Sequence, residues 1–311
     1  MTDLYHHILL LLKECKKNNQ KPLLVVCGPT ASGKTALALK LAEDFKGEII
    51  SADSCQVYRK MDIGTDKVGI DIRKKIKHHL IDVRDPDKQY TMSDFKREAT
   101  HAINEILMKG KLPIICGGTG LYISSVVENY DLPVAPPNPK IREELQKEYE
   151  KGGNMYLYNM LVELDPATAA KIHPNNVRFV ARALEVILQT HEPREPRKGK
   201  AIYQVFKMAV DWPREVLYDR INKRVDEQIE KGLLNEIKTL MAEGYGENLL
   251  SMQALGYKEY FPYISGLRPL QDFKEELKQN SRNFAKRQLT WFRRDDEIYW
   301  ITPDDFTKLC S

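Results

Sequence analysis

Residues 28–35 have the types and spacing of a loop that binds phosphate. They match the pattern G-x-x-x-x-G-K-[ST] at every fixed position. In such a loop the glycines let successive backbone N–H groups turn toward phosphate oxygens, the lysine neutralises charge and the hydroxyl binds Mg²⁺. We therefore predict a polyphosphate site with a magnesium ion on Thr35. The predicted phosphate-binding residues are Gly28, Pro29, Thr30, Ala31, Ser32, Gly33, Lys34 and Thr35.

The residues that follow the other predicted strands argue against an energy-coupling ATPase. Such an enzyme needs an acidic residue after a hydrophobic strand to organise Mg²⁺ and water, yet the apolar run 112–116 leads into Gly117-Gly118-Thr119-Gly120. Asp53 ends another apolar run and is followed by the polar Ser54 and Gln56. The loop is therefore expected to hold a leaving group. Asp53 itself has two interpretations, a catalytic base or a simple turn or helix-cap aspartate.

Apolar runs and helical segments alternate around this loop. Runs typical of buried strands cover 22–27, 48–52, 79–83, 112–116 and 203–210, with a helix expected over 91–108. This alternation predicts a three-layer α/β core with a mainly parallel sheet. Two proline-rich stretches bound a segment of helical character, so we predict a core of 1–130 and 199–311 and a helical insertion domain of 131–198.

Composition sets the broad class of the protein. Lys and Arg number 48 against 44 Asp and Glu, and 42% of the residues are hydrophobic, as in an ordinary globular enzyme. Five cysteines with no C-x-x-C pair suggest neither a disulfide framework nor a zinc module. The apolar run 7–12 is too short to span a bilayer and is expected to form a surface helix. These features predict a cytoplasmic protein without a membrane partner.

Blocks throughout the chain resemble the tRNA dimethylallyltransferases, also called tRNA isopentenyltransferases. The resemblance rests on the phosphate loop, on Asp53 to Arg59, on Met61 to Thr65, on His78 to Asp82 and on Gly117 to Tyr122, and it continues through His173 to Asn176, Arg182 to Glu185, Arg220 to Asp226, Gln253 to Lys258 and Lys286 to Arg293. It implies transfer of a dimethylallyl group from dimethylallyl diphosphate to N6 of the adenosine just 3′ of the tRNA anticodon. It also implies a P-loop core, a helical insertion domain (131–198) that contacts tRNA, and a chain of the bacterial type.

The resemblance implies roles for particular residues. Asp53 corresponds to the base that takes the proton from the adenine amine, and Thr30 to the threonine beside the bridging oxygen. Negative charge builds up on the departing diphosphate, and the candidate groups to stabilise it are Lys34, the loop amides, Thr35 with Mg²⁺, and Arg224. Mg²⁺ on Thr35 is the expected cofactor, and the enzyme is expected to act as a monomer.

The residues that the resemblance assigns to tRNA lie in both predicted domains. Basic and aromatic side chains of this kind contact phosphates and stack on unpaired bases. Phe179 stands at a family position that is often basic. The predicted tRNA-binding residues are Asp53, Ser54, Cys55, Gln56, Thr119, Arg142, Arg178, Arg182, Gln253, Gly256, Tyr257, Lys258, Lys286, Arg287, Gln288, Trp291 and Arg293.

Two other functions fit parts of the same sequence. A P-loop kinase of nucleosides or nucleotides would share the strand, loop and helix, and would use Arg194 and Arg197 as lid arginines that close on a γ-phosphate. A nucleotide-gated RNA-binding protein would bind tRNA and leave it chemically unchanged, so that replacing Asp53 would alter little.

Overall fold

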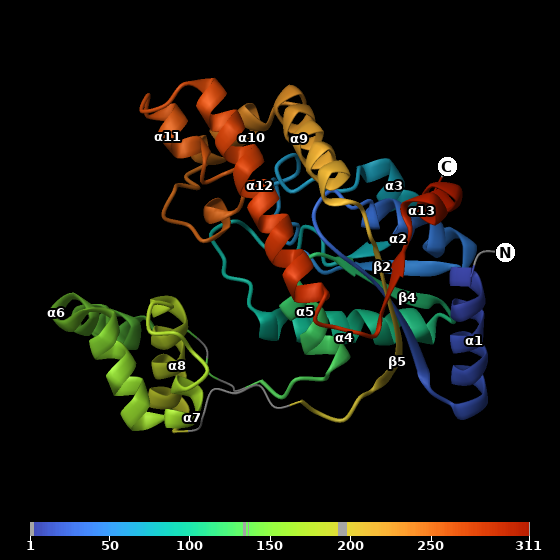
Figure 1. The fold of residues 1–311 in the computed structure, drawn as a ribbon, viewed down its shortest axis with the longest axis horizontal. Coiled ribbons are helices and arrows are strands. Elements are labelled where there is room, and N and C mark those ends of the chain that lie inside the picture. Colours follow the sequence, from blue (N-terminus) through green and yellow to red (C-terminus); the bar gives the residue numbers. More distant parts are fainter. Residues whose placement is uncertain (1–2, 133–134, 136, 192–197, 311) are drawn as a thin grey trace. The chain divides into compact units, whose positions relative to one another are not determined.

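The computed structural model of the chain describes residues 3–132, 135, 137–191 and 198–310. It forms two compact units (Figure 1). Unit 1 consists of Met1–Val127 and Ala201–Ser311, and unit 2 consists of Glu128–Lys200. The predicted insertion, 131–198, lies within unit 2.

Unit 1 is built on a six-stranded sheet with the order β3-β2-β4-β1-β5-β6. Every pair of neighbouring strands in it is parallel. The fold class predicted from the sequence, an α/β core with a mainly parallel sheet, is confirmed. The strands are β1 (Lys21–Cys27), β2 (Gly47–Ser51), β3 (His78–His79), β4 (Leu112–Gly117), β5 (Tyr203–Val210) and β6 (Ile298–Ile301).

Helices cover both faces of the sheet because successive side chains of a strand point to opposite sides. Leu24 and Val26 of β1 pack in one apolar cluster with α1, α2 and α13, which also lie together in Figure 1. Leu23 and Val25 pack in the other cluster with α4, α5 and α12. The helices are α1 (Asp3–Asn18), α2 (Lys34–Asp44), α3 (Ile70–Lys75), α4 (Met92–Met108), α5 (Gly120–Val127), α9 (Arg214–Glu230), α10 (Leu233–Ala242), α11 (Tyr260–Ile264), α12 (Leu270–Phe292) and α13 (Pro303–Cys310), with the 3₁₀ turn η1 (Ser251–Gln253).

Two strands differ from the sequence prediction. The run 79–83 forms a strand only at His78–His79, because Leu80 and Asp82 adopt positive φ angles of 63° and 58° that end the extended backbone. Strand β6 is not among the predicted runs, and it extends the sheet beside β5. The predicted N-terminal helix is present as α1.

Unit 2 is helical and has a small apolar core of its own. Its helices are α6 (Pro139–Leu164), α7 (Pro166–Ala169) and α8 (Val177–Thr190). Asn138 caps α6 just before a proline at the first helical position, and Gly153 kinks the helix with a φ of 72°. Asp165 separates α6 from α7 and accepts a hydrogen bond from Thr168 N over 3.0 Å. Within the ranges that the structure describes, no helix has the length and apolar character needed to cross a membrane.

A buried carboxylate ties the edge of the sheet to the end of α4. The Glu48 side chain is 3% exposed and lies 2.8 Å from His79 Nε2 and 2.9 Å from Lys111 Nζ. Burial alone would raise the pKa of Glu48, but the hydrogen bonds from Lys111 and His79 outweigh it and lower this pKa to about 2. The charged form of Glu48 is therefore favoured by the folded state.

We expect Glu48→Gln to destabilise the protein at pH 7 by on the order of 2 kcal/mol, because it leaves Lys111 and His79 without their anion. The folded-state pKa lies below the ordinary value of 4.5. The contribution of Glu48 to the free energy of unfolding is therefore complete above about pH 4.5 and is lost as the pH falls toward about 2. Urea unfolding at several pH values should show that the difference in unfolding free energy between wild type and variant becomes smaller below about pH 4.5. Glu43→Gln, at an exposed position, is the control. A difference in unfolding free energy for Glu48→Gln that does not change with pH would contradict this account.

Candidate active site

The phosphate loop, residues 28–35, joins the end of β1 to the start of α2. Gly28, Ala31 and Gly33 take positive φ angles of 134°, 61° and 88°, which turn the backbone sharply and are least costly for glycine. A Cβ at Gly33 would lie 2.5 Å from the Phe306 ring. The loop is therefore fixed in a shape that places its N–H groups at the N-terminal end of α2, where anions are favoured.

Two side chains from the second half of unit 1 hold the loop from outside. Trp212 Nε1 donates to the carbonyl of Ser32 over 2.8 Å, and Arg220 Nε donates to the carbonyl of Ala31 over 2.8 Å. The Arg220 guanidinium also lies 4.6 Å from the centre of the Trp212 ring. These two hydrogen bonds hold the carbonyls of Ala31 and Ser32 on the outer side of the loop.

Gln288 connects the phosphate loop to the loop after β4. Its Oε1 accepts from Thr30 N over 2.9 Å, and its Nε2 donates to the carbonyl of Gly118 over 3.0 Å. The side chain is buried, and a Cβ at Gly118 would lie 2.2 Å from it. Both ends of the Gln288 amide are therefore used inside the protein, and its expected contact with tRNA stays a prediction.

Asp53 follows β2 and begins a tight turn. Its Oδ1 accepts from Cys55 N over 2.9 Å and from Gln56 N over 3.4 Å. The turn interpretation of this aspartate is thus present in the structure, and within the described ranges Oδ2 makes no hydrogen bond. Thr119 fixes the same turn, since its Oγ1 accepts from Ser54 N over 3.1 Å.

Two hollows meet at the N-terminal end of α2, and Lys34 and Thr35 line both. The smaller one, called the inner cavity below, is also lined by Ser51, Asp53, Gln56 and His78. The larger one, called the outer cleft, has a volume of about 400 Å³ and is also lined by Asp66, Arg220, Lys223 and Arg224. A carboxylate and a cluster of cations are therefore placed on two sides of Lys34.

The cations of the outer cleft influence one another. Lys34 Nζ donates to the carbonyl of Pro29 over 3.1 Å, and burial together with the positive charge of Arg224 lowers the pKa of Lys34. Arg224 pairs with Asp66, with 3.2 Å between NH1 and Oδ2. An added anion in this cleft would relieve the repulsion between Lys34 and Arg224.

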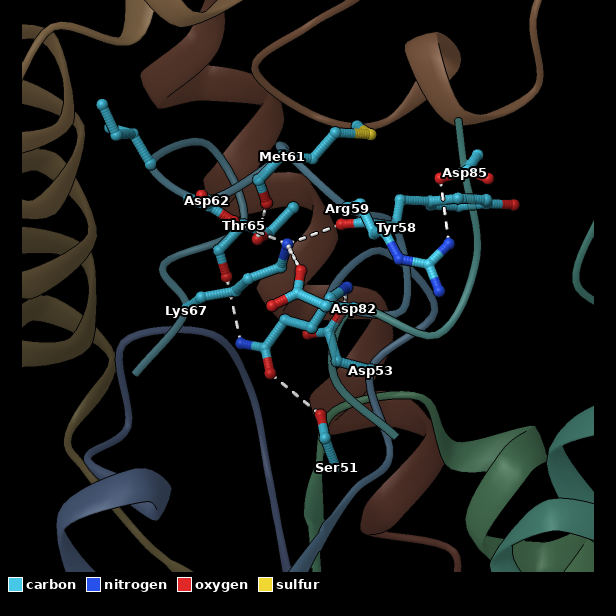
Figure 2. Close-up of polar contacts among 12 residues, drawn as sticks. Ser51, Asp53, Tyr58, Arg59, Met61, Asp62, Thr65, Lys67, Asp82 and Asp85 are labelled. Atoms are coloured by element: carbon cyan, nitrogen blue, oxygen red, sulfur yellow. Dashed lines mark hydrogen bonds and ion pairs between the residues drawn. The ribbon is translucent and has the colours of Figure 1, made fainter. Parts of the chain in front are cut away.

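A network of side chains fixes the segment 56–67 that carries Asp66. Figure 2 shows the buried Lys67 at its centre, donating to Asp62 Oδ1 over 2.7 Å and to Asp82 Oδ1 over 2.6 Å. The amide of Gln56 accepts from Ser51 Oγ over 2.9 Å and donates to the carbonyl of Thr65 over 3.1 Å. The Gln56 amide is thus engaged with protein groups, and its expected contact with tRNA stays a prediction.

Further support for this segment comes from side chains of α9 and α10 that the sequence did not predict. The Glu236 carboxylate accepts from the N–H groups of Asp62, Ile63 and Gly64 over 2.8, 2.7 and 3.1 Å. Gln228 Nε2 donates to the carbonyl of Ile63 over 3.0 Å. These partners lie more than 160 positions away along the chain, and the sequence contains no local signal for them.

Several predicted tRNA-binding residues gather on α12 and beside it. Lys286, Arg287, Trp291 and Arg293 are exposed, and a Cβ on Gly120 would lie 2.2 Å from the Trp291 ring. Trp291 therefore lies against the start of α5, next to the Thr119 turn. The Arg293 guanidinium is 5.4 Å from the centre of the Trp300 ring and pairs with Asp211 over 2.8 Å.

The predicted tRNA-binding residues of the segment 253–258 differ in their exposure to solvent. The Tyr257 side chain is fully buried, and its hydroxyl donates to Glu236 Oε1 over 2.7 Å. Its side chain is therefore engaged inside the protein, and its expected contact with tRNA stays a prediction. Gly256 is buried as well, with a φ of 95°, while Gln253 and Lys258 are exposed.

The predicted tRNA-binding arginines of unit 2 surround a buried carboxylate. Arg142 Nε and Arg182 NH1 donate to Glu185 over 2.8 and 2.6 Å, and the Glu185 side chain is 2% exposed. Arg182 also donates to the carbonyl of Ala135 over 2.7 Å. Arg178 is exposed on the same helix as Arg182. Arg142 and Arg182 thus have a structural partner within unit 2.

We expect Trp212→Phe to weaken binding of magnesium pyrophosphate roughly fivefold, since it removes the hydrogen bond that orients the Ser32 peptide and keeps a ring in place. Isothermal titration calorimetry measures this affinity directly. Trp300→Phe, a change of the same type away from the loop, should bind as wild type does. Equal affinity in all three proteins would show that the outer hydrogen bond does not organise the loop.

Sequence comparisons identify the family. The model of the family described as IPP transferase matches residues 56–295, and that of isopentenyl transferase matches residues 21–82. A tRNA dimethylallyltransferase of Acetivibrio thermocellus is 47% identical over 91% of this chain and 92% of its own. The corresponding protein of Alkaliphilus oremlandii is 45% identical over 92% of this chain and 93% of its own.

Solved structures agree with these relatives. The full-length tRNA isopentenylpyrophosphate transferase of Bacillus halodurans is 42% identical and superimposes with a TM-score of 0.70 over 94% of this chain and 93% of its own. A eukaryotic dimethylallyltransferase, captured acting on tRNA, is 29% identical with a TM-score of 0.77 over 93% of this chain and 75% of its own. The chain, with its phosphate loop between β1 and α2 and its aspartate at the end of β2, therefore belongs to the tRNA dimethylallyltransferase family.

Proposed function

We propose that this protein transfers a dimethylallyl group from dimethylallyl diphosphate to N6 of the adenosine immediately 3′ of the anticodon in tRNA, with release of pyrophosphate. The observation that carries the proposal is the position of Lys34, which lines both the outer cleft with its cations and the inner cavity with Asp53. A site for the leaving diphosphate thus adjoins a carboxylate able to accept the proton of the attacking amine.

The outer cleft is suited to the diphosphate. As the bond between the allylic carbon and the bridging oxygen breaks, negative charge grows on the departing group, and donors fixed in advance stabilise it. The loop N–H groups, Lys34 and Arg224 supply such donors without rearrangement of the backbone. We assign Thr30 to the region of the bridging oxygen, because its N–H is held by Gln288 at the turn of the loop.

Mg²⁺ fits this site through Thr35. The described residues contain no cluster of three or more acidic, histidine or cysteine side chains able to hold a metal by themselves. Mg²⁺ bound to phosphate typically takes few protein ligands and keeps several waters, and Thr35 lies on the border of both hollows. When bound, the ion would neutralise charge on the diphosphate, and the Thr35 hydroxyl would hold it.

Asp53 is assigned the role of base. The two N–H groups that bind Oδ1 fix the carboxylate and leave Oδ2 available to the substrate. The exocyclic amine attacks the allylic carbon as the carbon–oxygen bond breaks, and its proton passes to Asp53. Because the adenine must leave the anticodon-loop stack to reach this carboxylate, we place its path along Thr119 and Trp291. The exposed Lys286 and Arg287 on α12 would contact the RNA backbone.

The remaining parts of the proposal concern the cellular context. We propose that the enzyme acts as a monomer in the cytoplasm and that unit 2 contributes to tRNA binding through exposed basic residues such as Arg178. No observation favours the kinase. Its expected lid arginines, Arg194 and Arg197, lie outside the residues that the structure describes.

We expect Asp53→Asn to lower kcat at least 100-fold, because the amide cannot accept the amine proton, while the affinity for tRNA changes less than threefold. The assay incubates protein, Mg²⁺, dimethylallyl diphosphate and unmodified tRNA, followed by mass analysis of the digested nucleosides. Asp85→Asn, which breaks only an exposed pair with Arg59, is the matched control. Modification at the wild-type rate in Asp53→Asn would exclude the base, and wild-type protein that leaves every tRNA unmodified would overturn the proposed function.

A further inference from the structure

His78 presents a hydrogen-bond acceptor that the mechanism above does not use. It lies in β3, and its Nδ1 is 2.8 Å from the carbonyl oxygen of Ile76. A carbonyl oxygen only accepts hydrogen bonds, so Nδ1 carries the proton of the neutral ring and Nε2 has a lone pair. Burial lowers the pKa of His78, with Arg73 and His79 adding to the effect against the Ile76 hydrogen bond. The ring therefore stays neutral and keeps this acceptor.

The acceptor is buried, and His78 borders the proposed active site. His78 Nε2 has no hydrogen-bond partner within the described part of the chain. His78 lines the inner cavity together with Lys34 and Asp53. A buried polar atom without a partner is costly, which indicates a partner that the protein side chains do not supply.

The side chains around the inner cavity leave room for a water molecule in that role. Ser51 Oγ gives its hydrogen to Gln56 Oε1, and the Gln56 amide N–H groups are directed to the carbonyls of Thr65 and Asp66. The cavity offers water a volume of about 20 Å³, enough for roughly one molecule. A buried water needs two to four polar partners, and Lys34, Asp53 and His78 provide a donor and two acceptors.

We propose that His78 is a positioning residue of the active site: it accepts a hydrogen bond from one ordered water that donates its second hydrogen to Asp53 and accepts from Lys34. This water orients the carboxylate oxygen that receives the amine proton. Only the expected effect on kcat rests on the proposed transferase function. The water and the ring tautomer are properties of the free protein.

The neighbouring histidine provides a matched control. His79 belongs to the same short strand, and its Nε2 lies 2.8 Å from Glu48. It does not line the inner cavity. A substitution at His79 therefore disturbs β3 without removing the acceptor next to Asp53.

The test compares His78→Leu, His78→Gln and His79→Gln in steady-state tRNA modification. We expect His78→Leu to lower kcat roughly tenfold, with both KM values within twofold, because it removes one hydrogen bond to the water. His78→Gln places an amide oxygen near the position of Nε2 and should recover activity to within threefold of wild type. His79→Gln should retain wild-type kcat. Equal loss in His78→Leu and His78→Gln, or the same loss in His79→Gln, would indicate a merely structural role and overturn the proposal.

A second measurement does not depend on activity or on the folding of a variant. Nitrogen-15 NMR of the histidine rings in wild-type protein reports the tautomer, and a high-resolution crystal structure reports the water. We expect the Nδ1–H tautomer and a water within hydrogen-bond distance of His78 Nε2 and Asp53. An Nε2–H tautomer, or a dry cavity, would overturn the proposal. Wild-type protein that shows the tautomer and the water but modifies no tRNA would instead contradict the transferase function.

Discussion

The site depends on the parallel order of the strands. In a parallel sheet every carboxyl end lies at the same edge, and the order β2-β4-β1 brings three successive strand ends side by side. The Asp53 turn, the Gly118–Thr119 turn and the phosphate loop follow these strands. Backbone contacts join two of these loops, since Thr119 N donates to the carbonyl of Ala52 over 3.1 Å. The base, the glycine turn and the anion-binding loop are therefore neighbours as a consequence of strand order.

The second constraint is that a loop able to bind an anion must engage its own carbonyl groups elsewhere. The N-terminal half of unit 1 makes the loop, but the groups that hold it come from the chain after the insertion. Trp212 follows β5, Arg220 and Arg224 lie on α9, and Gln288 lies on α12. This arrangement explains why unit 1 needs both of its segments: β5 and β6 continue the sheet and bring those side chains to the loop. Unit 2 has its own apolar core, and the four anchors named above all belong to unit 1.

Sequence predicted the parts of the structure that depend on local pattern. The buried strands and the phosphate loop follow from apolar runs and glycine spacing, and Asp53 follows from its place after a strand. It did not predict the early end of β3, because the first positive φ is at Leu80 and leucine rarely adopts one. Nor did it show which way the side chains of a family motif point. Tyr257 and Gln288 were assigned to tRNA on their motif, yet packing over long sequence separations turns both inward.

The charged side chains of the segment 56–67 are of two kinds: some hold the backbone in place, and one, Asp66, forms an exposed ion pair that a ligand can replace. It has little regular backbone pairing, and a buried lysine and the carboxylate of Glu236 hold it instead. Removing one partner from a buried pair leaves an uncompensated charge, so Lys67, at 2% exposure, is held firmly. The pair between Arg224 and Asp66 is 26% and 49% exposed, and exposed pairs contribute about 0–1 kcal/mol. A diphosphate in the outer cleft can therefore take Arg224 from Asp66 at little cost. The backbone beneath that pair stays in place, because the buried Lys67 and the Glu236 carboxylate hold it.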